Sequence, residues 1–131
     1  MSTTYVVLDT NILVSALLTP TGNPAKVYKM FLTQVLTLVY SEKILDEYKD
    51  VLFRAKLRIP ADEANLIIIA IQQYGKLVNP DLSSIYMVDE DDRIFYDAAI
   101  SAGAHLITGN VRHFPSESFI LTPSEFLSNI P

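Results

Sequence analysis

The sequence predicts an α/β fold formed by one domain, residues 1–131, around a parallel β-sheet. Two observations predict it. Short apolar segments alternate along the chain with longer segments of helical periodicity, which is the order typical of parallel sheets. The first apolar segment, Tyr5–Leu8, is the continuous run YVVL rather than an alternation of apolar and polar residues. A continuous run is typical of a strand that helices cover on both faces.

The N-terminal half of the chain contains two predicted strands and four predicted helices. Pro24 suits the first turn of a helix, because that position needs no backbone N–H donor. Ser41 is the expected N-cap of the third helix, and Gly75 is expected to end the fourth. The predicted strands are residues 5–8 and 35–40, and the predicted helices are residues 12–18, 24–32, 42–54 and 60–74.

The C-terminal half contains three short predicted strands, a helix that ends at Gly103 and a terminal helix after the last strand. The predicted strands are residues 76–78, 105–108 and 119–121, and the first of the two helices covers residues 91–102. Functional sites of parallel sheets lie beyond the carboxyl ends of the strands. The candidate positions therefore directly follow Leu8, Tyr40, Val78 and Thr108.

The composition is acidic, since 10 Lys and Arg residues against 15 Asp and Glu residues give a net charge of −5. This charge provides no general attraction for nucleic acid or for an anionic membrane. Half of the residues are hydrophobic and no apolar run is long enough to span a bilayer, which argues against a disordered tail and a membrane protein. The absence of cysteine excludes disulfides and thiolate metal sites. The N-terminus lacks the pattern of a secretory signal, so we expect a cytoplasmic location.

Asp9 and Asn11 directly follow the first predicted strand. An ionised carboxylate at the end of a buried strand loses hydration, so a partner must compensate its charge. Two interpretations are open for Asp9. It is either the N-cap of the next helix or a ligand of a hard cation.

Glu47 lies at the border of the apolar face of the predicted helix 42–54. At about 100° per residue, its side chain falls beside Val51, whereas Asp46 points away from that face. Glu47 is therefore the carboxylate of this helix best placed to reach a site beside the sheet. The alternative is an exposed side chain at the edge of the face, supported by Lys43 four residues earlier.

An acidic cluster surrounds the start of the predicted helix 91–102, in the segment DEDDRIFYDAA. Asp91 and Asp92 fall on the apolar side of this helix at its N-terminal end. They either interact with the N-terminal dipole of the helix or contribute to a metal site. Asp89, just before the helix, is the expected cap. Asp97 points away from the apolar side, so we expect it on the surface.

Thr108 and Asn110 follow the fourth predicted strand and offer neutral oxygen atoms, either for a turn or for a site. Together with the acids, four segments then bring oxygen ligands toward one edge of the sheet, from Asp9, Glu47, Asp92 and Asn110. Clusters made only of oxygen ligands suit one or two Mg²⁺ or Mn²⁺ ions. Such ions support the hydrolysis of a phosphodiester, because they activate water and neutralise the leaving oxygen.

The segments VVLDTNILVSALL, SEKILDEYKDVL and DEDDRIFYDAAISAGAHLITGNVRHF, in this order, resemble the PIN-domain nucleases, above all the toxins of toxin–antitoxin systems. The resemblance implies a three-layer α/β/α sandwich with a parallel five-stranded sheet in the order 3-2-1-4-5. It implies Mg²⁺- or Mn²⁺-dependent cleavage of RNA, a homodimer and a cognate antitoxin. The catalytic and metal-binding residues that it implies are Asp9, Glu47 and Asp92, with Asn11 and Asn110 at the supporting polar positions. Asp91 and Thr108 are further candidates for support.

Other functions remain open. A PIN-like module that binds RNA or protein without cutting would share this fold. A haloacid-dehalogenase-like phosphatase would need a second acid two residues after Asp9, where Asn11 stands. For an RNA substrate, the basic residues near the proposed site that we expect to contact phosphates are Arg93, Arg112 and His113.

Overall fold

The computed structural model describes residues 3–129 and contains a five-stranded sheet whose pairings are all parallel. The strands are β1 (Tyr5–Leu8), β2 (Thr37–Tyr40), β3 (Lys76–Leu77), β4 (His105–Ile107) and β5 (Ile120–Leu121). Their order, β3-β2-β1-β4-β5, confirms the predicted one. The strand order reverses beside β1, so the carboxyl ends of β1 and β4 are neighbours at the position where α/β proteins bind ligands.

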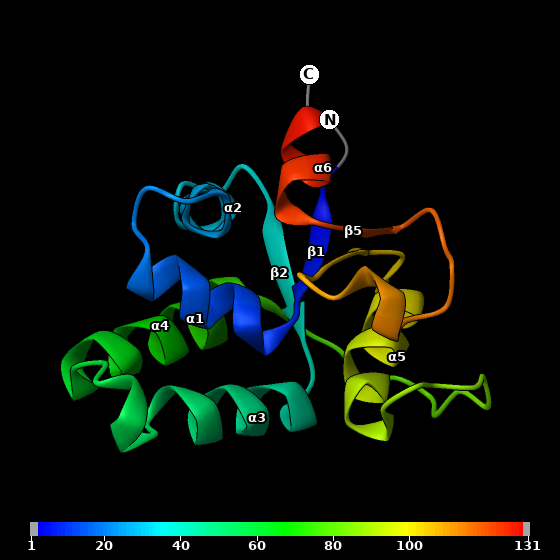
Figure 1. Ribbon diagram of the computed structural model, residues 1–131, viewed down its shortest axis with the longest axis horizontal. Helices are drawn as coiled ribbons and strands as arrows, with labels where there is room; N and C mark the ends of the chain where they lie inside the picture. The colour runs from blue at the N-terminus through cyan, green and yellow to red at the C-terminus, as the bar shows by residue number, and fades with distance from the viewer. Residues whose placement is uncertain (1–2, 130–131) are drawn as a thin grey trace.

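Helices cover both faces of the sheet and complete the expected three-layer α/β/α sandwich. They are α1 (Thr10–Leu18), α2 (Asn23–Leu32), α3 (Glu42–Leu52), α4 (Ala61–Tyr74), α5 (Arg93–Ala102) and α6 (Pro123–Ser128). α5 packs on β1, β2 and β4, and α4 packs on β2 and β3, whereas α2 contacts α1 and α6. Figure 1 shows α2 and α6 in the upper half of the view, with α3 and α5 in the lower half. No helix within residues 3–129 is long and apolar enough to cross a membrane.

Strand β1 lies at the centre of the core. Val6, Val7 and Leu8 have no exposed surface, as expected for a strand covered on both faces. The burial of these side chains fixes the register of β1 against β2 and β4 and thereby the position of the residue that follows Leu8.

Local signals set several boundaries. The Ser41 side chain accepts a hydrogen bond of 3.2 Å from the N–H of Ile44 and caps α3 as predicted. Gly103 ends α5 with a φ of 62°, in the left-handed region that favours glycine. Gly75 is needed for space, because a Cβ atom there would lie 2.5 Å from the carbonyl oxygen of Ile71. Glycine therefore lets the chain pass from α4 directly into β3.

Four predicted boundaries differ from the structure by two residues. The helix predicted over 12–18 begins at Thr10, and the helix predicted over 42–54 ends at Leu52. The helix predicted over 91–102 starts as a 3₁₀ turn, Glu90–Asp92, and becomes α-helical only at Arg93. The strand predicted over 35–40 begins at Thr37, because Gln34 adopts a left-handed φ of 62° and the chain is still turning after α2.

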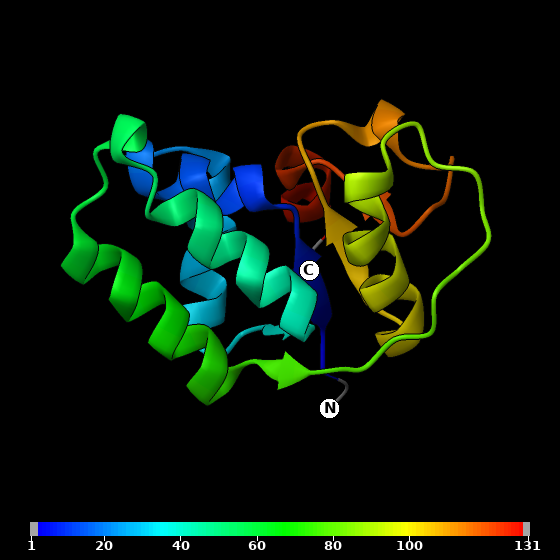
Figure 2. The same cartoon turned by 90° about the horizontal axis from the view of Figure 1, so that it is seen from below.

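The prediction that Asp97 is a surface residue is also wrong, since this residue is only 6% exposed. The segment of residues 79–88, which we call the strap, passes over this face of α5, and the N–H of Ser83 donates a hydrogen bond of 3.2 Å to Asp97 Oδ2. Figure 2 shows this part of the chain leaving β3, bowing around α5 and returning to the start of that helix. Helical phase describes the helix alone and cannot reveal a loop that covers it.

Candidate metal centre

Asp9 lies directly after β1, at the carboxyl edge of the sheet, and is 6% exposed. Its N–H donates a hydrogen bond of 3.0 Å to the carbonyl of Ile107, which extends the β1–β4 pairing by one residue. Its Oδ2 atom accepts a hydrogen bond of 2.8 Å from the hydroxyl of Thr108. Asp9 occupies the N-cap position of α1, and its carbonyl accepts a hydrogen bond of 2.9 Å from the N–H of Ile12, but its side chain forms no cap hydrogen bond.

The environment of Asp9 disfavours its ionised form. Burial is the largest cause and raises the pKa of this carboxyl above its ordinary value of 3.8. The hydrogen bond from Thr108 acts in the opposite direction, and the nearby negative charge of Glu47 raises the pKa further. A divalent cation bound to Asp9 would compensate the free-energy cost of its buried negative charge.

Glu47 is half-buried on α3, at the edge of its apolar face, whereas Asp46 is exposed, as the helical phase predicts. Its Oε2 atom accepts a hydrogen bond of 2.6 Å from the hydroxyl of Thr10, which is only 3% exposed. Lys43, the partner that the alternative interpretation gave to Glu47, forms no ion pair with it within residues 3–129. Thr10 thus orients Glu47 toward the end of β1. Sequence reasoning missed Thr10, and its only signal was a hydroxyl directly after Asp9.

Asp92 ends the 3₁₀ turn before α5, and its side chain is 18% exposed. Burial and the negative charges of Asp9 and Asp89 raise the pKa of Asp92 from 3.8 to about 6. His113 Nδ1 lies 3.8 Å from Asp92 Oδ2, where a protonated imidazole lowers this pKa. The expected cap of this turn is confirmed, because Asp89 Oδ1 accepts a hydrogen bond of 3.0 Å from the N–H of Asp91.

The structure therefore brings Asp9, Glu47 and Asp92 near one another, with Asp9 close enough to both of the others for their charges to interact. All their donor atoms are oxygens, which fits Mg²⁺ or Mn²⁺ and does not favour zinc. Within residues 3–129, no three His, Cys, Asp or Glu side chains are yet gathered tightly enough to hold an ion. The donor types fit a hard divalent cation.

The predicted supporting residues lie at different depths. Thr108 is fully buried, and its Oγ1 atom accepts a hydrogen bond of 3.0 Å from the N–H of Asn110. Asn11, Asn110 and Asp91 are exposed, and none of their side chains forms a hydrogen bond within residues 3–129. Among these four residues, only the side chain of Thr108 forms a hydrogen bond to one of the three acids.

The three residues predicted to contact RNA are also placed differently. Arg112 and His113 are exposed on the 3₁₀ turn Val111–His113, and His113 faces Asp92. The guanidinium of Arg93 instead donates to Glu90 and to the strap, and this side chain is only 12% exposed. These intramolecular bonds occupy the donors that a phosphate contact would need.

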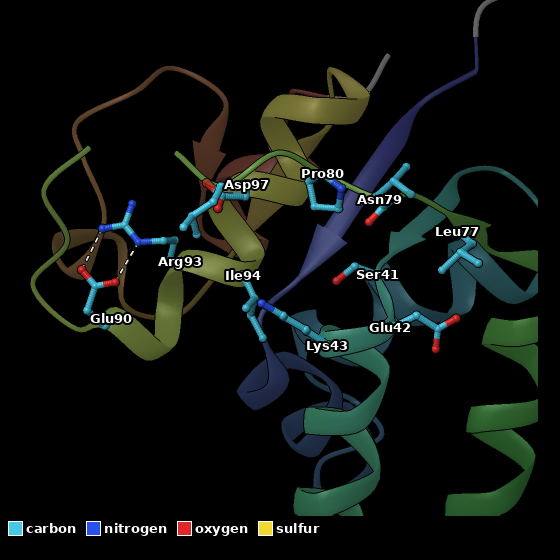
Figure 3. Close-up of a pocket in the computed structure, with 12 residues that line it drawn as sticks. Ser41, Glu42, Lys43, Leu77, Asn79, Pro80, Glu90, Arg93, Ile94 and Asp97 are labelled. Carbon is cyan, nitrogen blue, oxygen red and sulfur yellow. Dashed lines mark hydrogen bonds and ion pairs between the residues drawn. The ribbon is translucent and has the colours of Figure 1, made fainter. Parts of the chain in front are cut away.

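A cavity of about 450 Å³ lies beside this centre, between the start of α3, the end of β3 and α5. Figure 3 shows Arg93 and Asp97 on one side of it and Ser41 and Asn79 on the other. None of the three acids Asp9, Glu47 and Asp92 lines this cavity. The candidate metal centre is thus distinct from the cavity, although the two share α3 and α5.

Three comparisons place this geometry among known proteins. A family model described as "PIN domain" matches residues 5–112. An uncharacterized protein of Methanocaldococcus jannaschii is 32% identical over 108 residues, which cover 80% of this chain and 70% of that protein. The crystal structure of VapBC2 from Rickettsia felis, bound to a DNA fragment from the promoter, contains a chain with a similar fold. The TM-score is 0.52 at 17% identity, over 82% of this chain and 89% of that one. The chain belongs to the PIN domain family.

Proposed function

We propose that this protein is a metal-dependent endoribonuclease in which Asp9, Glu47 and Asp92 bind one or two Mg²⁺ or Mn²⁺ ions. The observation that carries the proposal is the charge of the site. Asp9 is buried beside two other carboxylates, and no Lys or Arg within residues 3–129 forms an ion pair with any of the three. Buried carboxylates that lack a cationic side chain need another counter-charge, and a divalent ion supplies it.

The residues of this chain perform distinct tasks in that site. Thr108 donates to Asp9 and Thr10 donates to Glu47, so each hydroxyl orients one carboxylate. His113 lies at the exposed side of Asp92, where an imidazole can bind a phosphate oxygen or pass a proton to the leaving oxygen. A bound divalent ion would supply the activation of water and the neutralisation of the phosphate charge.

Family membership supports hydrolysis, because PIN domains are generally nucleases and typically use divalent metal ions. We propose RNA as the substrate, with Arg112 and His113 as phosphate contacts. Because the net charge of −5 gives the protein no general attraction for RNA, individual basic side chains near the site must bind the phosphates. VapBC2, which has a similar fold, supports the proposal that a cognate antitoxin binds this chain. A homodimer and a cytoplasmic location complete the proposal.

The test is cleavage of an end-labelled single-stranded RNA, and of DNA of the same sequence, with Mg²⁺, Mn²⁺ or EDTA. We expect RNA cleavage with either metal, none with EDTA, and loss of at least about a hundredfold in rate for Glu47→Gln. Asp46→Asn is the matched control, because Asp46 is the neighbouring exposed acid on α3. Cleavage that persists in EDTA or in Glu47→Gln contradicts the assignment. RNA binding without cleavage by the wild-type protein would instead support a non-cutting PIN-like module.

A further inference from the structure

Two side chains of α5 hold the backbone of the strap. Within residues 3–129, the strap forms no backbone–backbone hydrogen bond. Instead, Asp97 accepts the N–H of Ser83, and the Arg93 guanidinium donates to the carbonyls of Ser83 and Ile85, at 2.9 and 2.7 Å. Arg93 and Asp97 are four residues apart on one face of α5. Their side chains therefore provide the hydrogen bonds to backbone N–H and C=O groups of the strap that a neighbouring β-strand would otherwise provide.

The same guanidinium also holds the turn that carries Asp92. Arg93 Nε and Nη2 donate to the two carboxylate oxygens of Glu90, both at 2.7 Å, and Nη1 also reaches the Ser83 hydroxyl at 2.8 Å. These contacts and the two to strap carbonyls make five hydrogen bonds, as many as a guanidinium has N–H donors. Figure 3 shows the forked contact between Arg93 and Glu90. One side chain therefore ties the strap to the turn Glu90–Asp92.

The turn Glu90–Asp92 is held in position mainly by the segments on either side of it, the strap before it and α5 after it. Glu90 and Asp91 are exposed, and Asp92 is only half-buried. Its own hydrogen bonds are local, from the N–H groups of Asp91 and Asp92 to the side chain and carbonyl of Asp89. The strap before it is anchored by Met87, which is 5% exposed, and by the contacts of Arg93. If the strap came loose, repulsion from Asp9 and Asp89 would push Asp92 away from the site.

We propose that Arg93 and Asp97 are positioning residues of the metal centre: by fixing the strap against α5, they hold Asp92 opposite Asp9. The inference rests on the proposed function, because it assumes that Asp92 is a metal ligand. It assigns a role to the buried Asp97, which the sequence places on the surface, and it replaces the RNA contact expected for Arg93. Both residues act through Asp92 and touch neither metal nor substrate.

The experiment measures Mn²⁺ affinity by isothermal titration calorimetry and hydrogen exchange of the strap by mass spectrometry. Arg93→Lys keeps the positive charge beside Asp92 but loses the fork that joins Glu90, Ser83 and Ile85. We expect about tenfold weaker Mn²⁺ binding and faster exchange in residues 79–92. The matched control is Arg54→Lys, because Arg54 pairs with Asp50 on the exposed surface of α3 at 2.9 Å and should bind Mn²⁺ normally.

Substitutions of Asp97 test the positioning role independently of Arg93. Asp97→Asn retains an oxygen that accepts the N–H of Ser83, so its Mn²⁺ affinity should stay close to that of the wild type. Asp97→Leu removes the acceptor and should weaken Mn²⁺ binding about tenfold, with kcat at saturating Mn²⁺ nearly unchanged. Circular dichroism confirms that each variant is folded, and Arg93→Lys serves as the test if Asp97→Leu is not.

The outcomes separate the two proposals. If the wild type binds Mn²⁺ and Arg93→Lys binds it equally well, the positioning role is wrong while the metal centre stands. Equal weakening in Arg93→Lys and Arg54→Lys also overturns the role, because it would reflect general loss of charge pairing. If the wild type binds no Mn²⁺, the proposed metal centre fails and this inference fails with it.

Discussion

Thr108 and Asp9 stand 99 positions apart in the chain, and a hydrogen bond of 2.8 Å joins the Thr108 hydroxyl to Asp9 Oδ2. The same hydroxyl oxygen accepts the N–H of Asn110, so its one proton is directed to the carboxylate. The bond spans the carboxyl ends of β1 and β4, and both residues are buried. It therefore sets the direction in which Asp9 faces Glu47 and Asp92.

Replacing Thr108 by Val removes this donor with little change of volume. The Asp9 carboxylate then loses a buried hydrogen bond, which lowers the free energy of unfolding by about 1 kcal/mol and raises the pKa of Asp9 further. Because Asp9 is no longer oriented, Mn²⁺ affinity should fall about tenfold. Urea unfolding and calorimetry measure the two effects. Thr33→Val is the control, since the Thr33 hydroxyl bonds the carbonyls of Lys29 and Met30 at an exposed helix end, away from the three acids. Wild-type Mn²⁺ affinity in Thr108→Val would contradict the orienting role.

The raised pKa of Asp92 predicts an opposite pH dependence for stability and for metal binding. Between the ordinary pKa of 3.8 and the value of about 6 in the folded protein, the folded state retains a proton that the unfolded chain has lost. The stability of the metal-free protein therefore falls as the pH rises through this window. Mn²⁺ binding strengthens over the same window, because the ligand must lose its proton.

Thermal unfolding at about pH 5 and about pH 7, with and without Mn²⁺, measures both trends. Asp92→Asn removes one of the two acids whose pKa is raised, so the pH dependence of the metal-free protein should become shallower across this window and keep the part that Asp9 contributes. A metal-free protein that becomes more stable between these two pH values in the wild type, but not in Asp92→Asn, would show that the pKa shift has the wrong sign.

Asp9→Asn should separate stability from metal binding. The amide removes a buried negative charge that burial and Glu47 disfavour, so the metal-free protein should be as stable as the wild type or more stable. At about a hundredfold excess over its Kd, Mn²⁺ should stabilise the wild type by about 2.7 kcal/mol and Asp9→Asn hardly at all. Differential scanning fluorimetry reads both effects, with Asp46→Asn as the control. A full Mn²⁺ shift in Asp9→Asn would remove this residue from the metal centre.

Gly75→Ala tests the junction between α4 and β3. The added Cβ atom would lie 2.5 Å from the Ile71 carbonyl oxygen and 3.1 Å from that of Leu38, so backbone must move. We expect a loss of about 1–3 kcal/mol in the free energy of unfolding. Gly109→Ala is the matched control, because its Cβ would meet no atom within 4 Å and should change stability by less than about 0.5 kcal/mol. Equal effects of the two substitutions, measured by urea unfolding, would refute the steric argument.

Much of the fold could be predicted from sequence because its causes are local or periodic. The continuous apolar run Tyr5–Leu8 predicts a strand buried on both faces, and Val6 and Val7 are indeed without exposed surface. Ser41 caps α3 where a hydroxyl before a helix predicts it. Helical phase also placed Glu47 correctly at the edge of the apolar face, because α3 is regular through that residue.

The errors occur where a distant segment changes the local rule. The helical phase of Asp91 and Asp92 holds only for an α-helix, but both residues lie in a 3₁₀ turn, and only Asp92 is half-buried. Helical phase alone predicts Asp97 on the surface because its own helix does not bury it, whereas the strap does. Arg93 looked free to bind phosphate because its partners Ser83 and Ile85 belong to that same strap.

The sequence by itself determined which chemistry is available to this protein. It supplies carboxylates after buried strands and at helix starts, no cysteine, and the hydrophobic patterns that form a parallel sheet. The tertiary structure decided which of these groups meet: Thr108 with Asp9, Thr10 with Glu47, and the strap with Arg93 and Asp97. The physical reason is the sequence separation over which each interaction acts. Periodicity and capping depend on neighbours within a few residues, whereas hydrogen bonds between residues 37 or 99 positions apart exist only after the sheet has brought the strand ends together.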